Sequence, residues 1–490
     1  MCGIVGYAGN IETACGKPLE VCLQGLERLE YRGYDSAGVA LTAPGMDKVV
    51  VRKKAGRLKN LVEDIERKPM PLATVGIGHT RWATNGEPSD VNAHPHTSMD
   101  GKVAIIHNGI IENASQLRLD LQAEGYRFAS ATDTEVAAKL LGKIVDKIIA
   151  DEGKPDLFKA VRRMARMLEG AFTILATDCR QPDIVVGARH DSPLVVGLGE
   201  GENFLGSDVA AFVAYTKRAM EVDQDQAVCV SADKVIVADF NGNVVENPKT
   251  YTVDWDASAA EKGGWDSFMD KEIHEDPAAV QRTLLGRFDA NGGIALDEVR
   301  IDEHDFKSID KIIVVACGTA SYAGQVAKYA IEHWVRIPVE IELAHEFRYR
   351  DPILTPRTLV VAISQSGETM DTLMALRHAR EQGSKVLAIC NTQGASIPRE
   401  SDAVLYTHAG PEVAVASTKA FVAQITAAYL LGLYLAQVKG AMFRDEIHQV
   451  LDSLKDMPRK IQWVLDTQPK TIQAAAERMV NANSFLFLGR

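Results

Sequence analysis

The second half of the chain alternates short apolar strands with helices, and this pattern restricts the fold more than any other feature. Three apolar segments, 312–316, 359–363 and 386–390, are predicted to be strands, and helical patterns lie between them. Strands separated by helices lie parallel in one sheet, because the crossover helix returns the chain to the same edge. The sequence therefore predicts an α/β, doubly wound parallel sheet over residues 301–445.

Three loops in this region are rich in Ser, Thr and Gly, and each leads into a helix: 317–321, 364–369 and 415–419. At the carboxyl edge of a parallel sheet, helix N-termini point free N–H groups at one place, where anions bind. Hydroxyl side chains are also preferred helix N-caps, so each loop alone is explained without a ligand. The chain has neither a Gly-x-Gly-x-x-Gly nor a Walker pattern, so a dinucleotide or nucleoside triphosphate is not indicated.

The helical segment 420–438 has no charged residue and is about as long as a membrane span. It contains Gln424 and Gln437 and lies inside the alternating pattern, so we expect a buried core helix. Lys419, just before it, is interpreted as a solvated residue at the helix start.

The chain begins Met1-Cys2-Gly3-Ile4-Val5-Gly6-Tyr7, and the strand formers after Cys2 predict a first strand here. If Met1 is removed, Cys2 has both a nucleophilic thiol and an α-amine. The amine has a pKa of about 8, which makes it a usable general base at neutral pH. The alternative interpretation is an ordinary buried cysteine behind the start codon.

Three later segments carry side chains suited to an amino-acid substrate. Arg81 presents a planar fork for a carboxylate, next to Trp82, which is large enough to cover a small pocket. Asn108 and Gly109 end an apolar strand, where they form either a tight turn or an oxyanion site. Asp133 opens a helix, as an N-cap or as the partner of an ammonium group.

Five segments together resemble the N-terminal-nucleophile glutamine amidotransferases. They are Cys2-Gly3-Ile4-Val5-Gly6, Arg32-Gly33-Tyr34-Asp35-Ser36, His79-Thr80-Arg81-Trp82-Ala83-Thr84, His107-Asn108-Gly109 and Thr132-Asp133-Thr134-Glu135.

The resemblance implies an α+β, four-layer N-terminal-nucleophile hydrolase domain over residues 2–250. It also implies that Cys2 attacks the glutamine amide while Asn108 and the Gly109 N–H form the oxyanion hole. Arg81 and Asp133 would bind the two charged ends of glutamine, and Trp82 would belong to the closing loop.

The second half resembles a sugar isomerase domain, most clearly in Ser364-Gln365-Ser366-Gly367-Glu368-Thr369. The two halves together resemble the glutamine–fructose-6-phosphate aminotransferase (isomerising), or glucosamine-6-phosphate synthase, family. The implied substrates are glutamine and fructose 6-phosphate, and no cofactor or metal is expected. The resemblance also implies a homodimer through the sugar isomerase domains. The resemblance implies that the hexose phosphate is bound by Thr319, Ser364, Gln365, Ser366, Thr369, Val415 and Ser417.

The predicted organisation also includes a linker with a packing helix over 251–300. Residues 446–490 are expected to begin a second, truncated sugar isomerase domain, because 484–490 repeats the strand-then-Gly pattern of 312–318. The family's Schiff-base lysine, isomerisation glutamate and ring-opening histidine are expected beyond that point. One alternative function is therefore a glutaminase-competent fragment without synthase chemistry, and another is a sugar-phosphate-binding regulatory protein.

Charge and cysteine usage restrict partners and location. The net charge of −12 argues against nucleic acid and acidic membranes as partners, and no basic DNA-binding helix pair is evident. The seven cysteines are scattered without a Cys-x-x-Cys pair, as expected in a reducing compartment. With no recognisable signal peptide, we expect a cytoplasmic enzyme.

Overall fold

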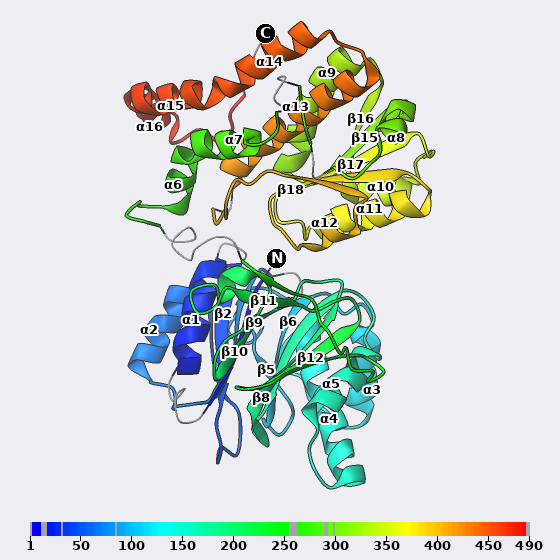
Figure 1. The fold of residues 1–490 in the computed structure, drawn as a ribbon. Helices are drawn as coiled ribbons and strands as arrows, with labels where there is room; N and C mark the ends of the chain where they lie inside the picture. The colour runs from blue at the N-terminus through cyan, green and yellow to red at the C-terminus, as the bar shows by residue number, and fades with distance from the viewer. Residues whose placement is uncertain are drawn as a thin grey trace. The chain divides into compact units, whose positions relative to one another are not determined.

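The computed structural model describes residues 2–10, 17–30, 33–83, 86–253, 262–288, 293–296, 299–414 and 416–486. The chain divides into two compact units, Met1–Glu261 and Lys262–Arg490, drawn as ribbons in Figure 1.

The described part of the first unit contains two antiparallel sheets. The eight-stranded sheet has the order β14-β11-β9-β10-β1-β4-β2-β3. Its strands are β1 (Gly3–Gly9), β2 (Ser36–Thr42), β3 (Val50–Ala55), β4 (Val75–Arg81), β9 (Val195–Leu198), β10 (Glu202–Gly206), β11 (Arg218–Glu221) and β14 (Thr250–Thr252). The six-stranded sheet has the order β13-β12-β8-β7-β6-β5. Its strands are β5 (His96–Thr97), β6 (Val103–Gly109), β7 (Phe172–Asp178), β8 (Gln181–His190), β12 (Gln226–Val230) and β13 (Val235–Asp239).

Alternating side chains of β1 enter two separate cores. Ile4 packs between the sheets with Ile106 and Leu175 of the other sheet, whereas Val5 packs under the outer helices. The eight-stranded sheet is covered by α1 (Lys17–Leu29), α2 (Leu58–Arg67) and the 3-10 helix η2 (Val209–Ala211). The other sheet is covered by α3 (Ala114–Ala123), α4 (Asp133–Glu152) and α5 (Leu157–Ala165). The predicted four-layer α+β fold is therefore confirmed.

The second unit is built on a parallel sheet of order β16-β15-β17-β18-β19. Its strands are β15 (Lys311–Ala316), β16 (Val339–Leu343), β17 (Thr358–Ser364), β18 (Lys385–Cys390) and β19 (Ala403–Tyr406). If the strands are numbered 1 to 5 along the chain, their order across the sheet is 2-1-3-4-5. The direction of winding therefore reverses between β15 and β17. Ligands of doubly wound folds bind at the carboxyl edge of such a switch point. The predicted doubly wound sheet is confirmed.

Helices cover both faces of this sheet. One face packs against α7 (Asp276–Leu284), α8 (Glu303–Ser308), α9 (Thr319–Val335), α13 (Lys419–Lys439) and α14 (Arg444–Lys455). The other packs against α10 (Ala344–Arg350), α11 (Met370–Glu381) and α12 (Ser396–Glu400). Within the described ranges, α13 is the one helix long and apolar enough to cross a membrane, but most of it is buried in this core, as expected for a core helix.

The part of the second unit that the structure describes also contains α6 (Phe268–His274), α15 (Met457–Thr467) and α16 (Pro469–Met479). Helices α15 and α16 bury none of their residues. Phe485 and Leu486, in the strand-then-Gly pattern of 484–490, are not in a strand, and residues 487–490 lie outside the described ranges. The predicted four-part division of the chain stays a prediction.

Candidate active site

Cys2 lies directly before β1, a central strand flanked by β10 and β4. Its Sγ accepts a hydrogen bond from the backbone N–H of Trp82 at 3.1 Å, because Gly3 pairs with Thr80 and Trp82 follows two residues later. Burial raises the pKa of the Cys2 thiol, and the Trp82 N–H and the Arg81 charge oppose this effect. The thiol therefore requires a base to become a thiolate at neutral pH.

Asn108, near the end of β6, connects the two sheets at this point. Its Nδ2 donates to the Cys2 carbonyl oxygen at 2.7 Å, and its Oδ1 lies 3.0 Å from His79 Nε2. Since Oδ1 can only accept, His79 must carry its proton on Nε2. Burial lowers the pKa of His79 to about 3, so the ring stays neutral and in this tautomer at pH 7. The second hydrogen of Nδ2 is then available to a ligand beside Cys2.

Gly109 follows with φ of +120°, a conformation that side chains disfavour. A Cβ at this position would lie 1.9 Å from the carbonyl oxygen of Ala171, so no other residue fits without moving the backbone. Glycine therefore allows the chain to turn immediately after Asn108.

Arg81 ends β4 and is 4% exposed, and its Nη2 donates to the carbonyl of Gly86 at 3.2 Å. Burial lowers the pKa of this guanidinium, while the charges of Cys2, Asp133 and Asp35 favour its protonated form. Trp82 is 44% exposed, and the edge of its ring meets Tyr34 at 5.3 Å between centroids. A buried cation thus lies beside an exposed aromatic ring next to the thiol.

Asp133 is the first residue of α4, and the helix N-cap is Thr132, whose side chain accepts from the N–H of Glu135. Asp133 Oδ2 accepts from the Ile111 N–H at 3.0 Å, two residues beyond Gly109. The same oxygen lies 3.9 Å from His107 Nδ1. These contacts connect the start of α4 to the end of β6, so the structure brings all six predicted glutaminase residues into one region.

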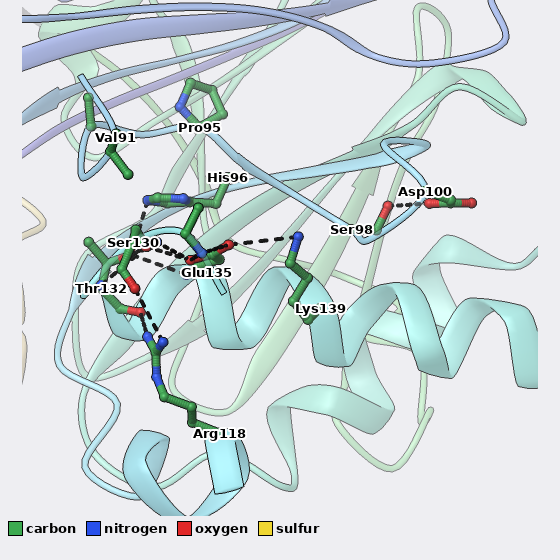
Figure 2. Close-up of polar contacts among 12 residues, drawn as sticks. Val91, Pro95, His96, Ser98, Asp100, Arg118, Ser130, Thr132, Glu135 and Lys139 are labelled. Carbon is green, nitrogen blue, oxygen red and sulfur yellow. Dashed lines mark hydrogen bonds and ion pairs between the residues drawn. The ribbon is translucent and has the colours of Figure 1, made fainter. Parts of the chain in front are cut away.

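A buried polar network supports the start of α4 (Figure 2). Glu135 accepts hydrogen bonds from the N–H groups of Ala129 and Ser130 and from the Ser130 hydroxyl, and it lies 3.8 Å from Lys139 Nζ. On the other side, Arg118 donates to the carbonyl oxygens of Ser130 and Thr132. The segment that carries Asp133 is therefore held from both sides.

Sequence reasoning did not predict the histidine cluster behind the site. His94 stacks on His79 with centroids 4.2 Å apart, and it meets His96 edge-on. Burial lowers the pKa values of His79, His94, His96 and His107, so all four rings are neutral at pH 7. The one signal in the sequence was the concentration of histidines at 94 and 96, around a proline.

The predicted sugar-phosphate loops lie at the carboxyl edge of the parallel sheet. Ser364 Oγ accepts from the Gly367 N–H at 3.0 Å and lies 3.1 Å from Thr369 Oγ1. Ser366 Oγ accepts from the Glu368 N–H. Gln365 follows directly after β17, and Thr319 is the first residue of α9 after β15, so these residues flank the switch point. Val415 lies outside the described residues.

The loop before α13 differs from expectation. Ser417 Oγ donates to Glu412, whose carboxylate also accepts from the N–H groups of Thr418 and Ala420. Lys419 is 2% exposed and forms an ion pair with Glu275, so the interpretation of a solvated lysine was wrong. An acid 144 residues away in the chain offsets the cost of burying the amine.

Comparisons with known proteins match family models to both halves of the chain. A glutamine amidotransferase domain model matches residues 79–214, and a SIS domain model matches residues 305–434. A solved structure of the C-terminal domain of glucosamine-fructose-6-phosphate aminotransferase from Francisella tularensis is 38% identical, with a TM-score of 0.45, over 47% of this chain and 64% of that chain.

Two curated relatives are named glutamine–fructose-6-phosphate aminotransferase [isomerizing]. The protein from Corynebacterium efficiens is 61% identical over 491 residues, covering 100% of this chain and 78% of the relative. The protein from Streptomyces coelicolor is 57% identical over 490 residues, covering 100% and 77%. Neither the fragment nor the regulatory alternative is favoured by these matches. At this identity over its full length, the chain belongs to the glutamine–fructose-6-phosphate aminotransferase (isomerising) family.

Proposed function

We propose that this protein transfers the amide nitrogen of glutamine to fructose 6-phosphate with isomerisation, giving glucosamine 6-phosphate and glutamate. The observation that carries the proposal is the pair of hydrogen bonds to Cys2. Its Sγ accepts one from the Trp82 N–H, and its carbonyl oxygen accepts one from Asn108 Nδ2. Family membership over the whole chain supplies the acceptor.

In the first half-reaction, the α-amine of Cys2 takes the thiol proton after Met1 is removed, and Sγ attacks the side-chain amide carbon of glutamine. Asn108 Nδ2 and the Gly109 N–H donate to the developing oxyanion. The C–N bond then breaks, and the leaving nitrogen takes back the proton held by the Cys2 α-amine and departs as ammonia. Water hydrolyses the thioester, which releases glutamate and restores the thiol.

Substrate binding is assigned to the charged groups around the thiol. Arg81 binds the glutamine carboxylate, Asp133 binds its ammonium group, and Trp82 covers the bound amino acid. In the structure, the buried Arg81 guanidinium already interacts electrostatically with the Asp133 carboxylate. Glutamine carries the complementary charges, a carboxylate for Arg81 and an ammonium group for Asp133, and this supports the assignment.

In the second half-reaction, ammonia adds to the C2 carbonyl of fructose 6-phosphate with loss of water, and the resulting imine isomerises to the aldose. We assign the hexose phosphate to Thr319, Ser364, Gln365, Ser366, Thr369, Val415 and Ser417. Support comes from the hydroxyl groups at the switch point of the parallel sheet, where doubly wound folds bind phosphorylated ligands.

The test is a paired assay of glutamate and glucosamine 6-phosphate. Cys2→Ala should abolish glutamate release, and so should an additional residue retained before Cys2, because the free amine is the base. Mass spectrometry of the active protein should show Cys2 at the N-terminus. Glutamate release by Cys2→Ala would refute the assignment of the nucleophile.

We also propose a cytoplasmic homodimer that associates through the sugar isomerase domain. Tyr322, Val326 and Tyr329 are exposed along one face of α9, at a spacing that brings them together. Light scattering should report a dimer for the native chain and a monomer for Tyr329→Glu. An unchanged dimer in that variant would place the interface elsewhere, and cell fractionation checks the location.

A further inference from the structure

Three potential metal ligands that are far apart in the sequence meet at the carboxyl edge of the parallel sheet. They are Cys317, His345 and Asp371, and their ligand atoms all lie within 4.8 Å of one another. The spacing of these residues in the chain is unlike any zinc motif, so the sequence did not indicate this group.

Topology explains why they meet. The three neighbouring strands β16, β15 and β17 run parallel, and Ala316 is in register with both Leu343 and Ile363. Cys317 follows β15 directly, His345 is the second residue after β16, and Asp371 lies in the first turn of the helix after β17. Each strand therefore delivers one ligand to the same edge.

The sulfur is held in place, whereas the other two ligands can adjust. Cys317 is half-buried, and its Sγ receives hydrogen bonds from the backbone N–H groups of Ala344 and His345 and a long one from the Thr372 hydroxyl, at 3.9 Å. His345 and Asp371 are exposed. The described contact of the His345 ring, to exposed Glu346 at 3.9 Å, is weak.

From this geometry we propose that Cys317, His345 and Asp371 form a site for a divalent cation of the zinc type. Thiolate, imidazole and carboxylate are the ligands that Zn²⁺ prefers, at bond lengths of about 2.0–2.3 Å. Ligand atoms around a tetrahedral ion lie about 3.5 Å apart, so from separations of at most 4.8 Å the exposed side chains need to move closer by no more than about 1.3 Å. With three protein ligands, the fourth position is left to water.

Zn²⁺ binds the thiolate form of cysteine, so binding releases the Cys317 thiol proton to solvent.

The test uses cobalt(II) as the probe on the full chain, after metals have been removed with a chelator. We expect a sulfur-to-cobalt charge-transfer band, visible d–d bands of a tetrahedral ion, saturation at one ion per chain, and displacement by zinc. Cys317→Ser should abolish the charge-transfer band. His345→Gln and Asp371→Asn should weaken cobalt binding at least about tenfold, since losing even an outer-shell partner of a metal ligand costs 10–100-fold.

Two controls make the result specific. His304→Gln removes a histidine whose side chain is 94% exposed, and Cys2→Ala removes the thiol of the glutaminase site. Neither variant should change the cobalt spectrum. Circular dichroism confirms that every variant is folded. The proposal is overturned if the native protein lacks the bands, if they persist in Cys317→Ser, or if they disappear in Cys2→Ala. It is also overturned if His345→Gln and Asp371→Asn bind cobalt as tightly as the native protein does.

Discussion

Substituting Glu135 by alanine tests whether the network at the start of α4 determines where Asp133 lies. The Glu135 carboxylate is 6% exposed and accepts from the Ser130 N–H at 2.6 Å, the Ser130 hydroxyl at 2.8 Å and the Ala129 N–H at 3.1 Å. After Glu135→Ala, the exposed Ala129 N–H can bind water, and the Ser130 hydroxyl can donate to Thr132 Oγ1, which is 2.9 Å away. The Ser130 N–H has no such replacement.

One buried unsatisfied donor costs about 1–3 kcal/mol, and Lys139 also loses its carboxylate partner. We therefore expect Glu135→Ala to lower the free energy of unfolding by about 2–4 kcal/mol, measured by urea titration with circular dichroism. Glu135→Gln keeps one acceptor and should lose about half as much. Because Asp133 starts the same turn, the KM for glutamine should rise about tenfold with a smaller change in kcat.

The matched control is Glu124→Ala, which removes a half-exposed carboxylate paired with Lys143. Exposed pairs contribute about 0.2–1 kcal/mol, and this variant should keep its KM for glutamine. If Glu135→Ala were no less stable than Glu124→Ala and had the same KM, the network would have no role in positioning Asp133.

Three further predictions follow from groups described above. Arg81→Lys should weaken glutamine binding by about 1.5–3 kcal/mol, because an ammonium group cannot replace a bidentate guanidinium, and an unchanged KM would refute the assignment. His79→Phe should lower the glutaminase kcat about tenfold by releasing the Asn108 amide, with the KM nearly unchanged, and unchanged kcat would mean that the hydrogen bond is structural. Burial, with the charge of Glu412, raises the pKa of Asp276 to about 6. The native state therefore binds this proton more tightly than the unfolded chain does, and the protein loses stability as the pH rises from about 4 to 6. Asp276→Asn should therefore melt at a higher temperature than the native protein at pH 8 but not at pH 4, and an equal difference at both values would contradict this reasoning.

Local patterns predicted the elements that depend on local interactions. The core helix expected over 420–438 appears as Lys419–Lys439, and the strand expected at 312–316 as Lys311–Ala316. Both are specified by the spacing of apolar side chains, which can be read from the amino-acid sequence. The order of strands in each sheet was not predicted, because it depends on long-range pairing.

Long-range partners also explain what the sequence did not reveal about the sites. Lys419 looked like a solvated residue because its carboxylate partner, Glu275, lies 144 residues earlier. The hydrogen bond that sets the tautomer of His79 comes from a strand of the other sheet, and Cys317 meets His345 only through strand register. Such neighbours are properties of the fold and cannot be read from local spacing.

The central position of β1 has a consequence for how the chain opens under native conditions. All seven residues of β1 are buried, and hydrogen bonds tie the strand to β10 on one side and β4 on the other. Amide protons in such a strand exchange with deuterium only when the whole unit unfolds, whereas exposed segments such as that of Trp82 exchange through small local openings. The sulfur of Cys2 is therefore attached to a segment whose amides should exchange slowly, while the exposed segment of Trp82 beside it should exchange faster.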